Sequence, residues 1–247
     1  MASTSETGHA KNVANFNDLI SFVTGYGTDY NPSKASIKLT ALQTVSSNAK
    51  NALNAVNSVL PEYSNAVAAR EAAFAPLNKL ITSVVNALKA TDTSDQVVGN
   101  AKTYARKIQG SRAAVKKTEG EKNAFAAAGK EVVEISSSQM SYDSRLDNFD
   151  KLIKLLSSVT LYVPNEADLK VSALTALYND LLAKNSAVVA ASTPLSNARI
   201  LRNEVLYKAN TGLVDITLDT KTYIKSLYGA TSPQYRQVSK LEFKSVR

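Results

Sequence analysis

Two arginines, Arg70 and Arg202, are the side chains whose type and spacing most directly suggest a chemistry. They stand 132 positions apart, on the apolar faces of two similar helical patterns, with Glu71 and Glu204 close by in sequence. A guanidinium in such a place can bind an anion or an acidic partner. It can also form a polar core layer that fixes helix register, or lie at a stripe edge with its head in water. We favour these structural interpretations.

The densest run of positive charge lies between Lys102 and Lys130. Such clusters neutralise phosphates, and the formal net charge of +8 with a pI of about 9.4 also favours polyanions. Glutamates interrupt the run and Tyr104 alone accompanies it, so a solvated helical face is the favoured interpretation. The candidate polyanion contacts are Lys102, Arg106, Lys107, Arg112, Lys116 and Lys117.

Residue types for acid–base or metal chemistry are scarce. The chain has no cysteine, which excludes disulfides, thiolate metal sites and a cysteine nucleophile. Its one histidine, His9, falls in a stretch expected to be flexible, where a catalytic base lacks a fixed partner. Asp143, Asp147 and Asp150 share a helix face, but no loop geometry supports a cation site there. We therefore expect no enzyme, no cofactor and no bound metal.

The elements that carry these residues occur twice in the chain. Asn15–Ile20 (NFNDLI) resembles Asn148–Ile153 (NFDKLI), and Pro32–Leu42 (PSKASIKLTAL) resembles Pro164–Leu174 (PNEADLKVSAL). A third match joins residues 102–110 with 221–229. Repeats of this kind indicate a duplicated structural unit. Identical pairs are mostly small or packing residues, which favours a helix interface over a reaction.

Each copy contains a long apolar stripe with steps of three and four residues, which is typical of a helix with one buried face. In the first copy the stripe keeps its phase past Pro61 and Pro76. The chain could turn back at Pro61 as a hairpin, but a turn would reset the phase, so we favour one kinked helix over residues 33–90. The second copy, with Pro194, is expected to run on to Tyr228.

The sequence thus predicts an all-α fold: an elongated helical bundle with internal duplication and approximate two-fold symmetry. Each repeat consists of a short helix and a long proline-kinked helix. We expect one compact domain. Its parts are a disordered tail (1–11), helical repeat 1 (12–110), a linker with a helix (111–144), helical repeat 2 (145–229) and an extended C-terminal tail (230–247).

The C-terminal tail changes character after Gly229. Val238, Leu241 and Phe243 alternate in part, which suits an extended segment better than a helix. An extended segment can add to a neighbouring subunit. We therefore treat Tyr235, Val238, Leu241 and Phe243 as candidate assembly residues.

Two stretches, Arg106–Gly110 (RKIQG) and Ser232–Val238 (SPQYRQV), resemble all-helical proteins of uncharacterised function from Bacteroidota bacteria. The similarity extends over most of the chain. It implies a bacterial, cytosolic setting, and neither motif carries a chemistry.

The leading hypothesis is a non-enzymatic structural or protein-interaction protein that associates with itself or with another protein. The alternative is a nucleic-acid-binding protein that uses the face formed by residues 102–130. A membrane-active helical protein ranks lower, because the best apolar stretch, near Ala124–Ile135, contains three charged residues. A polar N-terminus and the absence of any run of about 18 apolar residues predict a cytoplasmic protein without a transmembrane segment.

Overall fold

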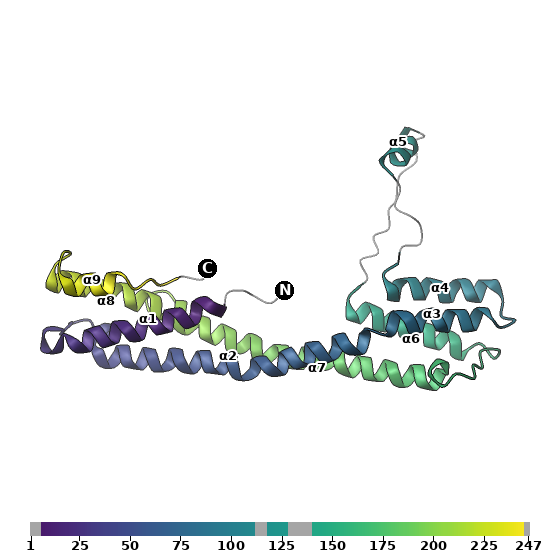
Figure 1. Cartoon of the computed structure of the whole chain (residues 1–247), viewed down its shortest axis with the longest axis horizontal. Helices are drawn as coiled ribbons and strands as arrows, with labels where there is room; N and C mark the ends of the chain where they lie inside the picture. The colour runs from purple at the N-terminus through teal and green to yellow at the C-terminus, as the bar shows by residue number, and fades with distance from the viewer. Residues whose placement is uncertain (1–5, 112–117, 128–139, 245–247) are drawn as a thin grey trace. The chain divides into compact units, whose positions relative to one another are not determined.

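A computed structural model describes residues 6–111, 118–127 and 140–244, and within these ranges the chain forms helices and loops but no strand. The α-helices are α1 (Glu6–Gly25), α2 (Leu39–Phe74), α3 (Leu77–Lys89), α4 (Asp95–Gln109), α5 (Glu119–Ala127), α6 (Tyr142–Ser157), α7 (Val171–Tyr207), α8 (Leu213–Tyr228) and α9 (Pro233–Ser239) (Figure 1). Three short 3₁₀ turns, η1 (Gly27–Asp29), η2 (Ala35–Ile37) and η3 (Ala167–Leu169), precede the two longest helices. The all-α prediction is confirmed.

The chain divides into two compact units. Unit 1 combines residues 1–64 with 191–247, and unit 2 is the continuous stretch 65–190. The apolar stripes of the long helices explain the division, because each stripe contributes to two cores. Leu42 and Ala49 of α2 are buried in the core of unit 1, whereas Phe74 of the same helix is buried in the core of unit 2.

Helix α2 passes through Pro61 without a break, so the chain makes no hairpin there. The interruption comes instead at Ala75 and Pro76, after which α3 begins at Leu77. Proline has no amide hydrogen and cannot continue the helical hydrogen-bond ladder, so the last bond of this turn runs from Ala75 N to the Glu71 carbonyl oxygen (3.0 Å). The expected helix over 33–90 is therefore shorter at its start and divided near its end.

The second long helix also ends earlier than expected. α7 stops at Tyr207, and a turn leads into α8 at Leu213. Asn210 adopts a positive φ of 64°, and a Cβ on Gly212 would lie 2.6 Å from the Lys208 amide nitrogen. Only glycine fits so close to a backbone, and asparagine is among the few residues that tolerate a positive φ. These two residues account for the break that the hydrophobic stripe concealed.

Both tails are more ordered than their composition indicated. Helix α1 begins at Glu6, inside the stretch 1–11 that was expected to be disordered, and its buried face carries Val13, Phe16, Leu19 and Val23. The tail from residue 230 was expected to be extended but contains α9. Ser232 caps this helix by accepting a hydrogen bond from Tyr235 N (3.1 Å), and Pro233 occupies its first turn.

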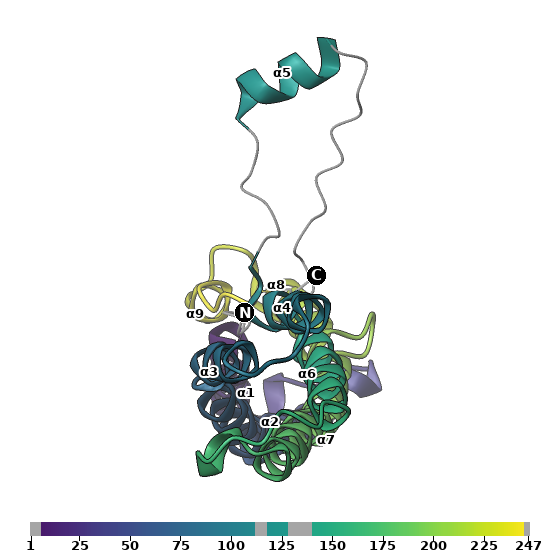
Figure 2. The same ribbon diagram turned by 90° about the vertical axis from the view of Figure 1, so that its right-hand side faces the viewer.

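Unit 2 contains α3, α4 and α6 together with parts of the two long helices. Figure 2 looks nearly along these helices and shows α4 next to both α3 and α6, which it contacts. The buried side chains of α3 recur at Leu77, Ile81, Val84 and Leu88, as a one-sided helix requires. Helix α8 of unit 1 has the same spacing of buried residues, at Leu213, Thr217, Thr220 and Ile224.

Candidate assembly site at the C-terminal segment

The four residues proposed for assembly come together against the core of unit 1 of their own chain. Val238 of α9 is fully buried, and Tyr235, Leu241 and Phe243 are partly buried against the same core. Ammonium groups of α8 lie over two of the rings: Lys225 Nζ is 5.8 Å from the Tyr235 ring centre and Lys221 Nζ is 5.2 Å from that of Phe243. Burial lowers the pKa of Lys221.

After α9 the chain is non-helical from Leu241 to Lys244. Side chains of α1 form hydrogen bonds with the backbone of this stretch. Asn12 Nδ2 donates to the Lys244 carbonyl oxygen (2.8 Å), and Lys244 N donates to Asn12 Oδ1 (3.0 Å). Asn15 Nδ2 donates to the Glu242 carbonyl oxygen (2.6 Å). Both asparagines are almost fully buried. They supply the donors and the acceptor that a neighbouring strand would offer, and these contacts do not depend on the side chains of the bound segment.

A cavity of about 310 Å³ lies beside this contact, lined by Gly8, Lys11, Asn12, Asn15, Glu242 and Lys244. From α8, Lys221 Nζ donates to the Leu241 carbonyl oxygen. The segment therefore has hydrogen-bond partners from α1, which ends at Gly25, and from α8, which begins only at Leu213. Such an arrangement can hold an extended peptide.

His9, to which the sequence assigned no role, is fully buried next to this site. Its Nδ1 lies 2.6 Å from the Tyr207 hydroxyl oxygen, which also accepts a hydrogen bond from Asn12 Nδ2 (3.3 Å). Burial raises the pKa of Tyr207, an effect that Asn12 and the charge of Arg202 partly oppose. Nothing in the local sequence signals this contact, because Tyr207 comes from the far end of α7.

The two candidate arginines belong to different units and have different partners. Arg202, in unit 1, is 3% exposed and directs Nε and Nη2 at Asn203 Oδ1 (3.1 and 3.0 Å). Arg70, in unit 2, donates from Nη1 to Asn185 Oδ1 (3.0 Å) and stacks 3.9 Å from the centre of the Tyr142 ring. Each guanidinium thus has partners within its own unit.

The basic face is described only in part. Lys102 and Lys107 are exposed on α4 and Arg106 is half-buried, whereas Arg112, Lys116 and Lys117 lie outside the described residues. Lys102 and Arg106 line a groove of about 280 Å³ between α3 and α4, together with polar side chains. The remaining lining residues are Thr82, Val85, Asn86, Ala105 and Gln109.

The aspartates of α6 already have partners. Asp143 accepts a hydrogen bond from Asn185 Nδ2 (2.7 Å), Asp147 pairs with Lys151 (2.6 Å), and Asp150 pairs with Lys154 (2.6 Å). In the described part of the chain, no cluster of three or more histidine or acidic side chains could hold a metal ion.

Among the helices that the structure describes, none is long and apolar enough to cross a membrane. Comparison of the chain with family models, curated proteins and solved structures gives no match.

Proposed function

We propose that this protein is a non-enzymatic structural or interaction protein that assembles with copies of itself through its C-terminal segment. The observation that carries the proposal is the pair of hydrogen bonds between Asn12 and the backbone of Lys244, extended by Asn15. These bonds recognise a peptide backbone rather than a particular side chain. The segment of a second copy can therefore replace the chain's own segment without any new contact, which is the usual route to a domain-swapped dimer.

The connection between α8 and α9 supplies the hinge for this exchange. Gly229 has a φ of 88°, so it already holds a backbone conformation that other residues rarely adopt. A change at Gly229, Ala230 and Thr231 would carry α9 and the segment after it to a neighbour. The bond energies are the same in both arrangements, so protein concentration sets the balance between them.

Internal duplication of the bundle, with approximate two-fold symmetry, is part of the proposal. Tyr30 Oη donates to the Ile37 carbonyl oxygen (2.6 Å) in unit 1, and Tyr162 Oη donates to the Leu169 carbonyl oxygen (2.9 Å) in unit 2. Both tyrosines are buried before a 3₁₀ turn and a long helix. The third sequence match does not fit this scheme, because it aligns α4 with α8. In the structure α8 contacts η2, and the helix that makes the corresponding contact with η3 is α3, not α4.

A matched pair of variants at Lys244 tests the assembly. Lys244→Pro removes the amide hydrogen that bonds to Asn12 Oδ1, whereas Lys244→Ala keeps the whole backbone contact. By light scattering at increasing concentration, we expect the wild-type protein and Lys244→Ala to reach twice the 26.5 kDa chain mass. Lys244→Pro should release the segment from α1 in either arrangement, and a released segment joins no neighbour. This variant and a chain truncated before Ser232 should therefore stay monomeric.

A peptide with the sequence of residues 240–247, added in excess, should compete with the exchanged segment and return the dimer to monomer. A wild-type protein that remains monomeric at every concentration would contradict the proposal. So would a truncated chain that keeps the native mass, because assembly would then use another surface.

A second candidate function, nucleic-acid binding, is favoured by the groove that Lys102 and Arg106 line between α3 and α4. The residues that line this groove include no aspartate or glutamate that would repel a phosphate. Binding through phosphates falls steeply with salt. If neither DNA nor RNA shifts the protein at low ionic strength, this candidate is excluded.

A further inference from the structure

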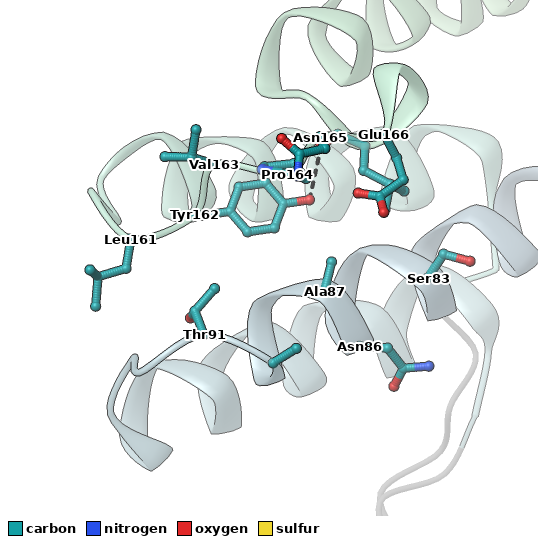
Figure 3. A pocket seen from close by; sticks show the side chains of 12 residues that line it. Ser83, Asn86, Ala87, Thr91, Leu161, Tyr162, Val163, Pro164, Asn165 and Glu166 are labelled. Carbon is teal, nitrogen blue, oxygen red and sulfur yellow. Dashed lines mark hydrogen bonds between the residues drawn. The ribbon is translucent and has the colours of Figure 1, made fainter.

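A cavity of about 590 Å³ in unit 2 lies between α3 and the segment that leads into α7. One wall consists of side chains from α3 and from the turn that follows it, among them Ser83, Ala87 and Thr91. The other wall contains the Tyr162 ring, the half-exposed Leu161 and the carboxylate of Glu166. In Figure 3 the Tyr162 ring faces Ala87 across the cavity, with Leu161 near Thr91 at one end and Glu166 near Ser83 at the other. We call this arrangement the Tyr162 corner.

Unit 1 contains a closely similar arrangement, the Tyr30 corner, formed by Tyr30, η2 and α8. η2 contacts α8 as η3 contacts α3, and the tyrosine of each corner bonds to the carbonyl oxygen seven residues later. The matching burial patterns place Tyr223 of α8 where α3 has Ala87. The two corners are therefore alike in these contacts, whether or not the two units arose by duplication.

An aromatic ring fills the Tyr30 corner. Tyr223 packs edge-on against Tyr30, with ring centres 5.3 Å apart and planes at 87°. This is the preferred T-shaped geometry of aromatic pairs, which stabilises the two rings beyond the effect of their burial. Ala87 offers no ring to Tyr162, so the equivalent space in unit 2 is the cavity.

An ion pair spans the Tyr30 corner and has no equivalent at the matching positions of the Tyr162 corner. Lys34, before η2, pairs with Asp219 of α8. The corresponding positions of unit 2 are Glu166 and Ser83, both in the cavity wall. The carboxylate therefore lies on the opposite wall, and no ion pair joins it to another of the described residues. Glu166 lies close enough to Tyr162 to contribute, after burial, to the raised pKa of that phenol.

We propose that the Tyr162 corner binds a small aromatic amine. The ligand supplies the two groups that unit 1 provides from its own chain and unit 2 lacks. Its ring lies edge-on to Tyr162 above Ala87, and its ammonium group pairs with Glu166. The cavity volume lies within the range of about 300–1,000 Å³ that is usual for small-molecule sites.

Tyramine, p-cresol and 4-hydroxyphenylacetate separate the contributions of ring and charge, because they share a phenol and differ in a cationic, absent or anionic second group. Titrations of the full chain should show saturable tyramine binding by ligand-observed NMR. We expect p-cresol to bind about fivefold more weakly, in line with a partly exposed ion pair, and 4-hydroxyphenylacetate more weakly still.

Two variants test whether the ligand binds in the cavity. Ala87→Tyr introduces the ring that unit 1 has at the equivalent position and should abolish binding of both phenols. Glu166→Gln should weaken tyramine about fivefold and leave p-cresol unchanged. Lys89→Tyr, on the same helix but outside the cavity lining, is the matched control and should bind as the wild type does.

Failure of tyramine to bind the wild-type chain overturns the proposal. Undiminished binding in a folded Ala87→Tyr protein does so as well, because the ligand would then lie elsewhere. Equal affinities for tyramine and p-cresol, with no effect of Glu166→Gln, would show that the cationic group is not recognised. Since Glu166 is exposed at the rim, Glu166→Gln keeps the test decisive even if Ala87→Tyr does not fold.

Discussion

The Tyr30 corner and the Tyr162 corner share a hydrogen bond, a 3₁₀ turn and a neighbouring helix, yet one is filled and the other is hollow. The residues that differ are few. Tyr223 gives way to Ala87, and the Lys34–Asp219 pair gives way to Glu166 and Ser83. The backbone arrangement is thus maintained by contacts that both corners have, and the side chains beyond them are free to specialise. One corner serves stability, and the other offers space.

Removing the ring from the filled corner should have the largest effect on stability. Tyr223→Ala takes away the aromatic contact and leaves a cavity in unit 1. Full removal of a buried aromatic side chain costs about 3–5 kcal/mol, so we expect the half-buried Tyr223 to cost about 2 kcal/mol in urea unfolding. Hydrogen exchange should locate the weakening at residues 30–42.

Thr222→Ala, at an exposed neighbouring position, is the control and should change the free energy of unfolding by less than about 0.5 kcal/mol. If Tyr223→Ala is equally harmless, Tyr223 does not close the corner, and the comparison of the two units fails.

Alkaline titration should affect both corners alike. Burial, foremost, raises the pKa of Tyr30 and of Tyr162 to about 12, above the usual 10 of a free phenol. The folded state therefore favours the neutral phenol over the phenolate. The contribution of each tyrosine to the free energy of unfolding is fully present below pH 10 and is lost as the pH rises through 12. Between pH 9 and pH 11.5 the urea midpoint of the wild type should fall. It should fall less in a double variant that carries both Tyr30→Phe and Tyr162→Phe, because phenylalanine does not ionise.

At pH 8 each of these two substitutions removes one buried hydrogen bond and should cost about 1 kcal/mol. Markedly unequal costs would show that the two bonds do different work, against the similarity on which the comparison rests.

Transferring the ion pair should have the smallest effect. Ser83→Asp with Glu166→Lys would place in unit 2 the charges that Lys34 and Asp219 carry in unit 1. Exposed ion pairs contribute about 0–1 kcal/mol to stability, so the midpoint temperature of thermal unfolding should rise slightly or not at all. Each single substitution serves as a control, and a loss in the double variant would mean that the walls are spaced differently in the two corners.

The sequence predicted those features that a periodic pattern carries. The stripe of α2 and its continuation past Pro61 followed from steps of three and four residues. The ends of the helices were harder to place. Gly212 was not identified as a breaker because its need for glycine depends on the backbone of Lys208, which the chain approaches only once it has folded.

The contacts of the candidate sites depend on residues that are distant in sequence, and this limited their prediction. His9 meets Tyr207, and Asn12 meets Lys244, across some 200 residues. Neither asparagine belongs to a motif, and a single histidine in a polar stretch gives no sign of burial. Ala87 is informative only beside Tyr223, and that alignment has an offset different from the one that the repeat displays in sequence.

The discontinuity of unit 1 has a consequence for synthesis on the ribosome. Residues 65–190 emerge as an uninterrupted stretch and can form unit 2 while the rest of the chain is still being translated. Helix α1 and the first part of α2 emerge earlier, but they must wait for residues 191–247 before their core is complete. Contacts of such high sequence separation slow folding. During that interval the buried face of α1 is open to solvent, to chaperones and to the last segment of any copy that has already been released nearby.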